Sequence, residues 1–292
     1  MLVIGNTSEA RRLADRLSAR VAILEHEVFP DGEVMMHLTD DAREDDVLLY
    51  YQFSRQESLD AQILRLMALL RSLNNRAGIR LVLPYFPYAR SLPWGNERVV
   101  TSAEPMLAAI KNQVRELWTI DLHCANSVLQ PYVGEVKVSE LSLRATIASF
   151  LQEKFTEVVL VAPDRGAENR VRNLAALLKV SYLAMNKQRR SATEVVVEMP
   201  KGFYKTNKQY IIVDDIISTG KTFAAAIAQL RQSGIDQVAG VITHNVARVE
   251  TIQSFVADGV PIFTSNSTAR DDWHFDVLES VVEAAQQIKL AV

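Results

Sequence analysis

The sequence predicts an α/β protein of two similar domains, each a mostly parallel sheet flanked by helices. Short apolar runs rich in Val and Ile alternate with helix-like segments almost throughout the 292 residues, a pattern typical of parallel sheets covered by helices. Both halves hold several strand and helix units, with a polar or acidic cluster after a strand. A helix expected to begin near residues 138–142 places the boundary there, giving domains 1–140 and 141–292. We expect that the last helix can pack back on the first domain.

The spacing of apolar residues predicts the individual elements. Strands are short apolar runs, whereas helices show apolar residues recurring at every third or fourth position. In the first half, strands over residues 2–5, 46–51, 79–83 and 116–120 alternate with helices over 8–18, 59–73 and 103–111. In the second half, strands over 157–162, 180–184, 209–213, 237–243 and 260–264 alternate with helices over 141–154, 167–178, 221–232 and 277–290.

Composition narrows the class of protein. Hydrophobic residues make up 48% and charged residues 23%, with a net charge of −3, so nothing favours nucleic acid or a membrane surface as a partner. An anionic ligand must then be held by local groups. The single cysteine, Cys124, excludes an internal disulfide and suits a reducing compartment. No apolar run approaches transmembrane length, and we expect a cytoplasmic protein.

The segment IIVDDIISTGKTF, residues 211–223, carries the strongest chemical signal. An apolar strand leads into Asp214 and Asp215, and a turn over residues 218–220 precedes a helix. The N–H groups of a tight turn and a helix N-terminus bind phosphate, while the two acids suit ribose hydroxyls or Mg²⁺. The GKT ending is not a P-loop, because Asp215 stands where the first glycine is required. The segment predicts a ribose-phosphate site; an ordinary strand followed by a capped helix is the alternative.

Two further motifs combine aromatic and charged residues. FPDGE, residues 29–33, offers an aromatic ring and two acids, but Pro-Asp-Gly is also favourable in an ordinary surface turn. PYFPYAR, residues 84–90, follows a strand and places aromatic rings beside a guanidinium. That arrangement can stack on a base and pair with phosphate. An aromatic loop packed beneath its neighbours is the alternative.

Two predicted strands end in groups that suit a metal ion. DLH, residues 121–123, supplies a carboxylate and an imidazole that can hold a divalent cation directly or through water. A hydrogen-bonded structural histidine is the alternative for His123. In APDRGA, residues 162–167, Asp164 precedes a helix, where it is either a metal ligand or the helix N-cap.

A basic segment, KQRRSATEV, spans residues 187–195. Such a run of charge is usually a solvated surface. The alternative is a mobile lid that brings Lys187 and Arg189 to the charge developing during phosphoryl transfer, where cations act electrostatically.

Taken together and in order, the motifs resemble those of the ribose-phosphate pyrophosphokinases, also called phosphoribosyl pyrophosphate synthetases. FPDGE, PYFPYAR, DLH, PDRGA, KQRRSATEV and VDDIISTGKT follow that family's order with similar intervals over nearly the whole chain. The STG form of the ribose-phosphate loop and the KxR followed by SxTEV look most like the shorter, archaeal-type branch. The resemblance implies two phosphoribosyltransferase-like (Rossmann-like) domains, with ATP and ribose 5-phosphate meeting between them.

The resemblance also implies a reaction, partners and residue roles. The C1 hydroxyl of ribose 5-phosphate would attack the β-phosphorus of ATP, giving phosphoribosyl pyrophosphate and AMP with Mg²⁺ as cofactor. The enzyme would be a homodimer or larger homo-oligomer whose ATP sites are often built partly from a neighbouring subunit. The implied roles are catalysis by Lys187 and Arg189; ATP binding by Phe29, Asp31, Gly32, Glu33, Arg90 and Ser91; metal binding by His123 and Asp164; and ribose-phosphate binding by Asp214, Asp215, Ser218, Thr219, Gly220, Lys221 and Thr222.

Two departures from the family pattern bear on the substrate. The family commonly has a glutamine and an acid after Arg90, but Ser91 and Leu92 follow here, then residues 93–95 (Pro-Trp-Gly). Lys221 replaces the small residue usual in the ribose-phosphate loop. These changes leave open a larger acceptor such as ADP-ribose, or a non-catalytic regulatory homologue. A phosphoribosyltransferase shares the loop, but that interpretation leaves FPDGE, PYFPYAR and the basic segment without roles.

Overall fold

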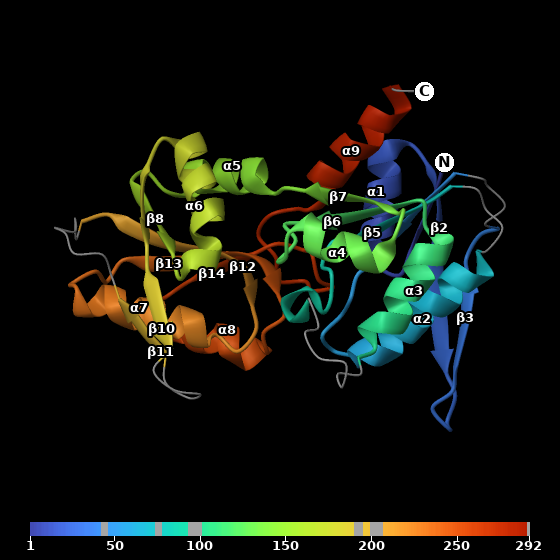
Figure 1. The fold of residues 1–292 in the computed structure, drawn as a ribbon, viewed down its shortest axis with the longest axis horizontal. Helices are drawn as coiled ribbons and strands as arrows, with labels where there is room; N and C mark the ends of the chain where they lie inside the picture. The colour runs from blue at the N-terminus through green and yellow to red at the C-terminus, as the bar shows by residue number, and fades with distance from the viewer. Residues whose placement is uncertain (42–45, 74–77, 93–100, 190–194, 199–206, 291–292) are drawn as a thin grey trace. The chain divides into compact units, whose positions relative to one another are not determined.

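The computed structural model describes residues 1–41, 46–73, 78–92, 101–189, 195–198 and 207–290, with the backbone alone for 186–189, 195–198 and 289–290 (Figure 1). Parallel sheets flanked by helices occur in both halves, which confirms the α/β prediction. The described residues divide into two compact units. Unit 1 comprises those of 1–142 together with 267–270 and 277–290, and unit 2 comprises those of 143–266 together with 271–276.

Unit 1 is built on a seven-stranded sheet in the order β3-β2-β1-β4-β5-β6-β7. All neighbouring strands pair in parallel except β2 and β3, which form an antiparallel hairpin. The strands are β1 (Leu2–Gly5), β2 (Arg20–Val28), β3 (Val34–Leu38), β4 (Val47–Tyr50), β5 (Ile79–Leu83), β6 (Glu116–Ile120) and β7 (Lys137–Leu141).

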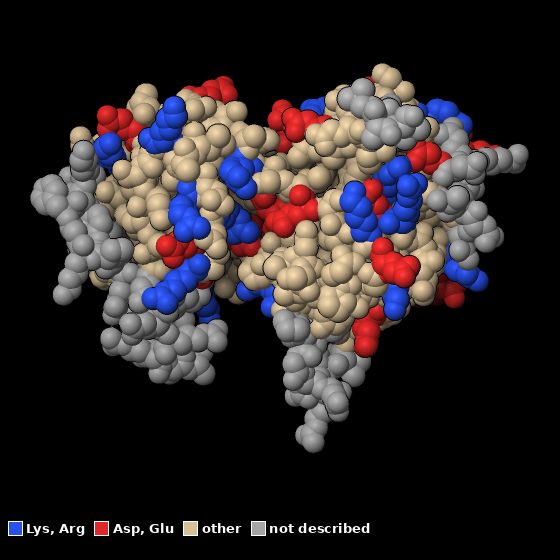
Figure 2. Space-filling view, turned by 45° about the horizontal axis from the view of Figure 1, so that its top comes forward, with Lys and Arg blue, Asp and Glu red and all other residues tan. Residues whose placement is uncertain are grey.

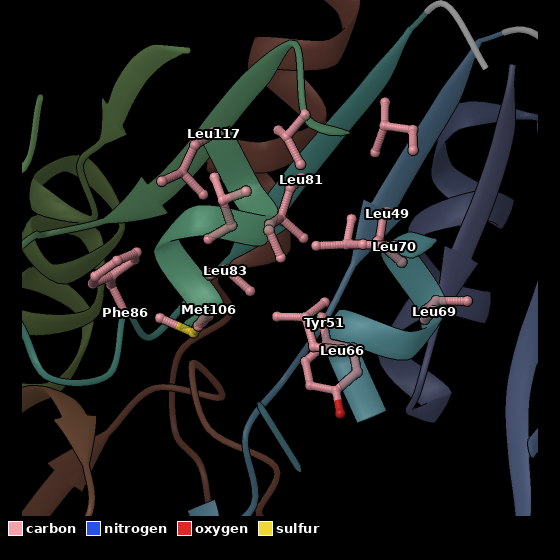
Figure 3. Close-up of a cluster of buried hydrophobic side chains, with 14 of the residues drawn as sticks. Leu49, Tyr51, Leu66, Leu69, Leu70, Leu81, Leu83, Phe86, Met106 and Leu117 are labelled. Atoms are coloured by element: carbon pink, nitrogen blue, oxygen red, sulfur yellow. The ribbon is translucent and has the colours of Figure 1, made fainter. Parts of the chain in front are cut away.

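Helices cover both faces of this sheet, with α2, α3 and α4 on one face and α1 and α9 on the other (Figure 1). On the first face, Leu49, Leu81 and Leu117 of the strands meet Leu66 of α2 and Met106 of α3 (Figure 3). Each fully buried side chain of this size contributes about 1.5–3 kcal/mol. The helices are α1 (Ser8–Leu17), α2 (Leu59–Ser72), α3 (Ala103–Gln113), α4 (Asn126–Val133) and α9 (Leu278–Leu290), with a 3₁₀ turn η1 (Ala89–Ser91) after β5.

Unit 2 is built on a five-stranded parallel sheet in the order β14-β13-β12-β8-β9. Helices α5 and α6 lie on one face and α7 and α8 on the other, and a small hairpin, β10-β11, lies beside α7 (Figure 1). The strands are β8 (Val158–Ala162), β9 (Ser181–Ala184), β10 (Asn186–Arg189), β11 (Val195–Glu198), β12 (Gln209–Ile217), β13 (Val238–Asn245) and β14 (Ile262–Thr264); the helices are α5 (Arg144–Lys154), α6 (Arg165–Leu178), α7 (Lys221–Gln232) and α8 (Val249–Ala257).

The structure corrects several predicted elements. The helix expected over residues 141–154 was wrong at its start, because β7 pairs with β6 through Leu141 before α5 begins at Arg144. The strand expected over 209–213 continues to Ile217, because β13 pairs with it that far. The sequence pattern did not predict β2, β3, β7, β10, α4 or α8. These are polar, exposed or short elements, and only their partners in the fold stabilise them.

Charge on the surface is mixed. On the face shown in Figure 2, Lys and Arg are interspersed with Asp and Glu on both units, in keeping with the net charge of −3. Among the described residues, no helix combines the length and apolar character needed to cross a membrane.

A row of charged side chains stabilises the amino ends of the strands in unit 1. Arg80 on β5 contacts Asp46, and its Nε lies 3.7 Å from Oε2 of Glu116 on β6. Nζ of Lys137 and Oγ of Ser139, both on β7, each lie 2.9 Å from Oε1 of Glu116. Burial acts to raise the pKa of Glu116, but hydrogen bonds from Lys137, Trp118 and Ser139 outweigh it and hold the pKa below the usual value.

Glu116→Gln is expected to lower the free energy of unfolding at pH 7 by about 1–2 kcal/mol, because charge-assisted hydrogen bonds become neutral ones. A carboxylate with a lowered pKa in the folded protein stabilises above its unfolded pKa and loses that contribution as the pH falls through the folded pKa. The difference between the proteins should therefore shrink below about pH 4. Urea unfolding across pH measures it, and the exposed Glu135→Gln is the control. An unchanged difference at low pH would contradict the assignment.

Candidate functional site

The strand order of unit 2 reverses between β8 and β12. After β8 the chain adds β9 on one side, and it then returns to place β12 on the other side. In open parallel sheets, ligands bind at the carboxyl ends of the two strands where the order reverses, because the connections that follow them go to opposite faces. Here β8 leads into Asp164, and the carboxyl end of β12 carries Asp214 and Asp215. The structure thus brings together two motifs that are about 50 residues apart in the sequence.

Asp164 is the N-cap of α6. Its Oδ1 accepts hydrogen bonds from the N–H groups of Gly166 at 2.9 Å and Ala167 at 3.3 Å, which confirms the helix-cap interpretation. The pairing of Val161 with Ile212 brings Asp164 beside the acids of β12. Both cap bonds go to one carboxylate oxygen, so capping is compatible with the predicted role in metal binding.

Asp214 is half-buried, and its Oδ1 accepts a hydrogen bond from the N–H of Asp215 at 2.9 Å. Burial raises the pKa of Asp214 well above the usual value, and the charges of Asp215 and Asp164 raise it further, while Arg170 acts in the opposite direction. A bound cation or a pair of ligand hydroxyls would relieve this repulsion. The cluster therefore suits Mg²⁺ or the hydroxyls of a ribose.

Asp215 is 3% exposed and forms an ion pair within the protein. Its Oδ2 lies 3.5 Å from Nη2 of Arg170, which is on the second turn of α6. Sequence reasoning missed Arg170, because its role follows from the packing of α6 against β12. Its one sequence signal is a position six residues after Asp164, on the helix that Asp164 caps.

The loop after β12 has the geometry of a phosphate cradle. Gly220 has φ +74° and is the N-cap of α7, and no side chain caps that helix. The first-turn N–H groups of α7 can therefore serve a ligand anion. Ser218 and Thr222 are half-buried, whereas Thr219 and Lys221 are exposed. Residues 218–222, at the uncapped N-terminus of α7, thus carry three hydroxyl groups and one ammonium group.

The corresponding edge of unit 1 is closed. Its strand order reverses between β1 and β4, but a side-chain network lies there. Nδ2 of Asn6 donates to O of Gln52 at 2.7 Å, Oδ1 of Asn6 accepts from N of Gln52 at 2.9 Å, and Oγ1 of Thr7 donates to Oε1 of Gln52 at 2.6 Å. Gln52 is 1% exposed. The two units share a topology, but the acids and the phosphate loop belong to unit 2.

PYFPYAR divides into a packed part and an exposed part. Phe86 is buried in the core, and Oη of Tyr88 donates to Asp60 of α2 at 3.0 Å, so the packed-loop interpretation holds for these rings. Arg90 and Ser91 follow in η1 and are exposed. Residues 93–95, which depart from the family pattern, lie outside the described residues.

His123 leaves the same edge of unit 1 as Arg90, because β5 and β6 are neighbouring parallel strands. His123 is exposed. The turn begins at Asp121, which has φ +39° and donates its N–H to O of Leu141 at 2.9 Å. Within the described ranges, no three His, Cys, Asp or Glu side chains are gathered for a metal ion. Mg²⁺ is typically held by one or two carboxylates together with substrate phosphates, so the oxygen donors of unit 2 fit it without a closed cage.

The FPDGE turn lies apart from Arg90 within unit 1. It forms the tip of the β2-β3 hairpin, closed by the N–H of Phe29 donating to O of Glu33 at 2.8 Å, with Gly32 at φ +89° and Asp31 exposed. Three strand spacings separate β2 from β5, or roughly 14 Å at about 4.8 Å each. Pairing of β2 with β1 ends at residue 23, so the hairpin extends well beyond the sheet (Figure 1).

Lys187 and Arg189 lie on β10, opposite Val197 and Val195 of β11. Their side chains, and residues 190–194 between the two strands, lie outside what the structure describes. The basic segment thus begins within one strand, β10, and ends at the start of another, β11. The lid role stays a prediction.

Comparisons with known proteins identify the family of the chain. Residues 2–113 match the family model of the N-terminal domain of ribose phosphate pyrophosphokinase, and residues 137–253 match that of the phosphoribosyl transferase domain. The ribose-phosphate pyrophosphokinase of Pyrococcus abyssi is 31% identical over 256 residues, which cover 84% of each chain. That of Sulfolobus acidocaldarius is 29% identical over 99% of this chain and 100% of its own. These archaeal relatives confirm the archaeal-type resemblance.

The fold is likewise shared with a solved structure. The crystal structure of phosphoribosylpyrophosphate synthetase from Mycobacterium smegmatis has a TM-score of 0.82 and 21% sequence identity, covering 100% of this chain and 99% of that one. The match extends over both units and shows that their described parts share this fold.

Gly220→Ala is expected to destabilise the protein by more than Gly259→Ala does. Both glycines have φ above +70°, and a side chain there costs about 1–2 kcal/mol. A Cβ at Gly220 would also lie 2.9 Å from Cε2 of Phe255 and 3.0 Å from Cγ2 of Thr251, whereas a Cβ at Gly259 meets nothing within 4 Å. Overpacking should add about 1–3 kcal/mol. Urea unfolding measures the free energy of unfolding of both variants. An equal decrease in the two variants would show that the turn before α7 tolerates the methyl group.

Proposed function

The chain belongs to the ribose-phosphate pyrophosphokinases, and we propose that it transfers the β,γ-diphosphate of ATP to the C1 hydroxyl of ribose 5-phosphate. The products are phosphoribosyl pyrophosphate and AMP. One observation carries the proposal: an acid cluster and an uncapped helix N-terminus share the edge of unit 2 where the strand order reverses. That edge offers acceptors for ribose hydroxyls beside donors for a phosphate.

The acceptor binds at β12 and the loop that follows it. The N–H groups at the start of α7, with the hydroxyls of Ser218, Thr219 and Thr222, hold the 5-phosphate, and Gly220 supplies the turn. Asp214 accepts hydrogen bonds from the ribose hydroxyls, and Asp215 supports it from the α6 side. The exposed Lys221 adds positive charge beside the phosphate. The sugar is thereby oriented for attack from C1.

The transfer forms a bond between the C1 oxygen and the β-phosphorus of ATP and breaks the bond between that phosphorus and the oxygen bridging it to the α-phosphorus. AMP leaves with the bridging oxygen, and the proton of the C1 hydroxyl is released to water. Lys187 and Arg189 stabilise the charge that develops on the transferred group. Asp164 would offer a carboxylate oxygen to Mg²⁺, and His123 would offer an imidazole nitrogen; the ion would supply charge that neutralises the phosphates of the substrates. Arg90 and Ser91 contact the nucleotide.

The acceptor is tested by supplying ATP and Mg²⁺ with either ribose 5-phosphate or ADP-ribose and measuring AMP formation. We expect AMP and phosphoribosyl pyrophosphate in equal amounts from ribose 5-phosphate, because unit 2 holds one phosphate loop beside the acids. AMP formation with ADP-ribose but not with ribose 5-phosphate would assign the larger acceptor. The sequence departures at residues 93–95 and Lys221 leave that acceptor open. No AMP with any acceptor would assign a regulatory homologue.

The nucleotide site draws on two copies of the chain in a homodimer or larger homo-oligomer. The hairpin tip exposes four large apolar side chains, Val28 (61%), Phe29 (37%), Val34 (40%) and Met35 (50%), a cluster typical of an interaction surface. Three strand spacings separate β2 of this hairpin from β5, the strand that leads to Arg90. Phe29, Asp31, Gly32 and Glu33 of one copy therefore complete the site that Arg90 begins on another.

Subunit complementation tests the shared site. Asp31→Ala and Lys187→Ala should each abolish turnover, but co-refolding the two variants should restore about a quarter of wild-type activity, since statistical mixing leaves one intact site in half of the dimers. Asp31→Ala mixed with Glu33→Ala should stay inactive, because both changes fall on the hairpin. No recovery in the first mixture would place each complete site within one chain.

A further inference from the structure

Arg170 joins the acid cluster from a different element. It projects from α6 to Asp215 on β12, with Nη2 3.5 Å from Oδ2, and the two side chains are 26% and 4% exposed. Asp215 in turn donates its backbone N–H to Oδ1 of Asp214 at 2.9 Å. A continuous chain of polar contacts thus runs from the guanidinium to the acid predicted to hold the ribose.

The ion pair compensates negative charge that is concentrated at this edge of the sheet. Asp164, Asp214 and Asp215 place three carboxylates at one edge, and the charges of Asp164 and Asp215 both bear on Asp214. Removing one partner from a buried ion pair costs much more than removing both, because the remaining charge is left uncompensated. Asp215 is the most buried of the three acids, so its carboxylate depends most on a nearby cation.

We propose that Arg170 is a positioning residue of the sugar-phosphate site, which holds Asp215 and, through its backbone N–H, orients the Asp214 carboxylate toward the acceptor. The inference rests on the proposed function. Arg170 itself does not touch the acceptor: its guanidinium is committed to Asp215 on the α6 side of the sheet, whereas the phosphate loop leads into α7 on the other face (Figure 1).

The proposal gives different roles to Asp214 and Asp215, the two acids of the VDD segment. Asp215 is paired with Arg170 of α6, whereas Asp214 accepts the backbone N–H of Asp215. Asp214 is the acid that serves the ribose, and Asp215 serves the fold of the site. Neutralising Asp215 should therefore be tolerated only when Arg170 is neutralised with it.

The experiment measures binding of ribose 5-phosphate by calorimetry, together with the KM values for ribose 5-phosphate and for ATP. Arg170→Gln should weaken ribose 5-phosphate binding and raise its KM by about tenfold, with the KM for ATP changed less than about twofold, because the uncompensated Asp215 displaces its neighbour. Arg170→Gln/Asp215→Asn, a neutral pair of similar size, should recover to within about threefold of wild type. Arg170→Lys should recover in part.

Arg172→Gln on the same helix is the control, since Arg172 is exposed and bonds Asn169; it should leave all three quantities unchanged. Equal rises in both KM values with a lowered Tm, or a double variant weaker than Arg170→Gln, would overturn the positioning role. If Arg170→Gln does not fold, Arg170→Lys and the double variant give the same comparison. Wild-type protein that binds no ribose 5-phosphate would instead overturn the proposed acceptor, so the two failures are distinguishable.

Discussion

Mutual repulsion among Asp164, Asp214 and Asp215 is the constraint on which the site depends. The three acids meet because β8 and β12 are adjacent parallel strands and both lead into acids at the same edge. Each is compensated differently: Asp164 by the N–H groups of α6, Asp215 by Arg170, and Asp214 by the N–H of Asp215. Asp214, whose pKa is raised by burial and by its neighbours, is the acid left to gain most from a ligand.

The two units show how one topology yields one open site and one closed edge. Both sheets reverse their strand order, β1 against β4 in unit 1 and β8 against β12 in unit 2. In unit 1, Gln52 fills that position and bonds Asn6 and Thr7. In unit 2, carboxylates and an uncapped helix stand there instead. Topology supplies the position, and the side chains decide whether a ligand can use it.

The residues proposed to bind the nucleotide are arranged differently. Arg90 and His123 follow β5 and β6, away from the closed reversal point, and the FPDGE turn lies on a hairpin that extends beyond the sheet. Phe29 is exposed at its tip. A site assembled from a second copy accounts for both the distance across the sheet and the exposed apolar cluster. On this proposal activity requires assembly, because the hairpin of one copy would complete the nucleotide contacts of another.

The sequence by itself determined the α/β class, most strands and helices, and the family, because apolar periodicity and the order of six motifs are local properties of the chain. It also predicted the turn at residues 218–220 and the helix that follows, because both are specified within a few residues. It missed β7 and the start of α5, because a polar edge strand is stabilised only by its neighbour. It also did not indicate Arg170. Only the tertiary structure revealed the ion pair between Arg170 and Asp215 and the burial of Asp215, because both depend on α6 packing against β12, which no local pattern encodes.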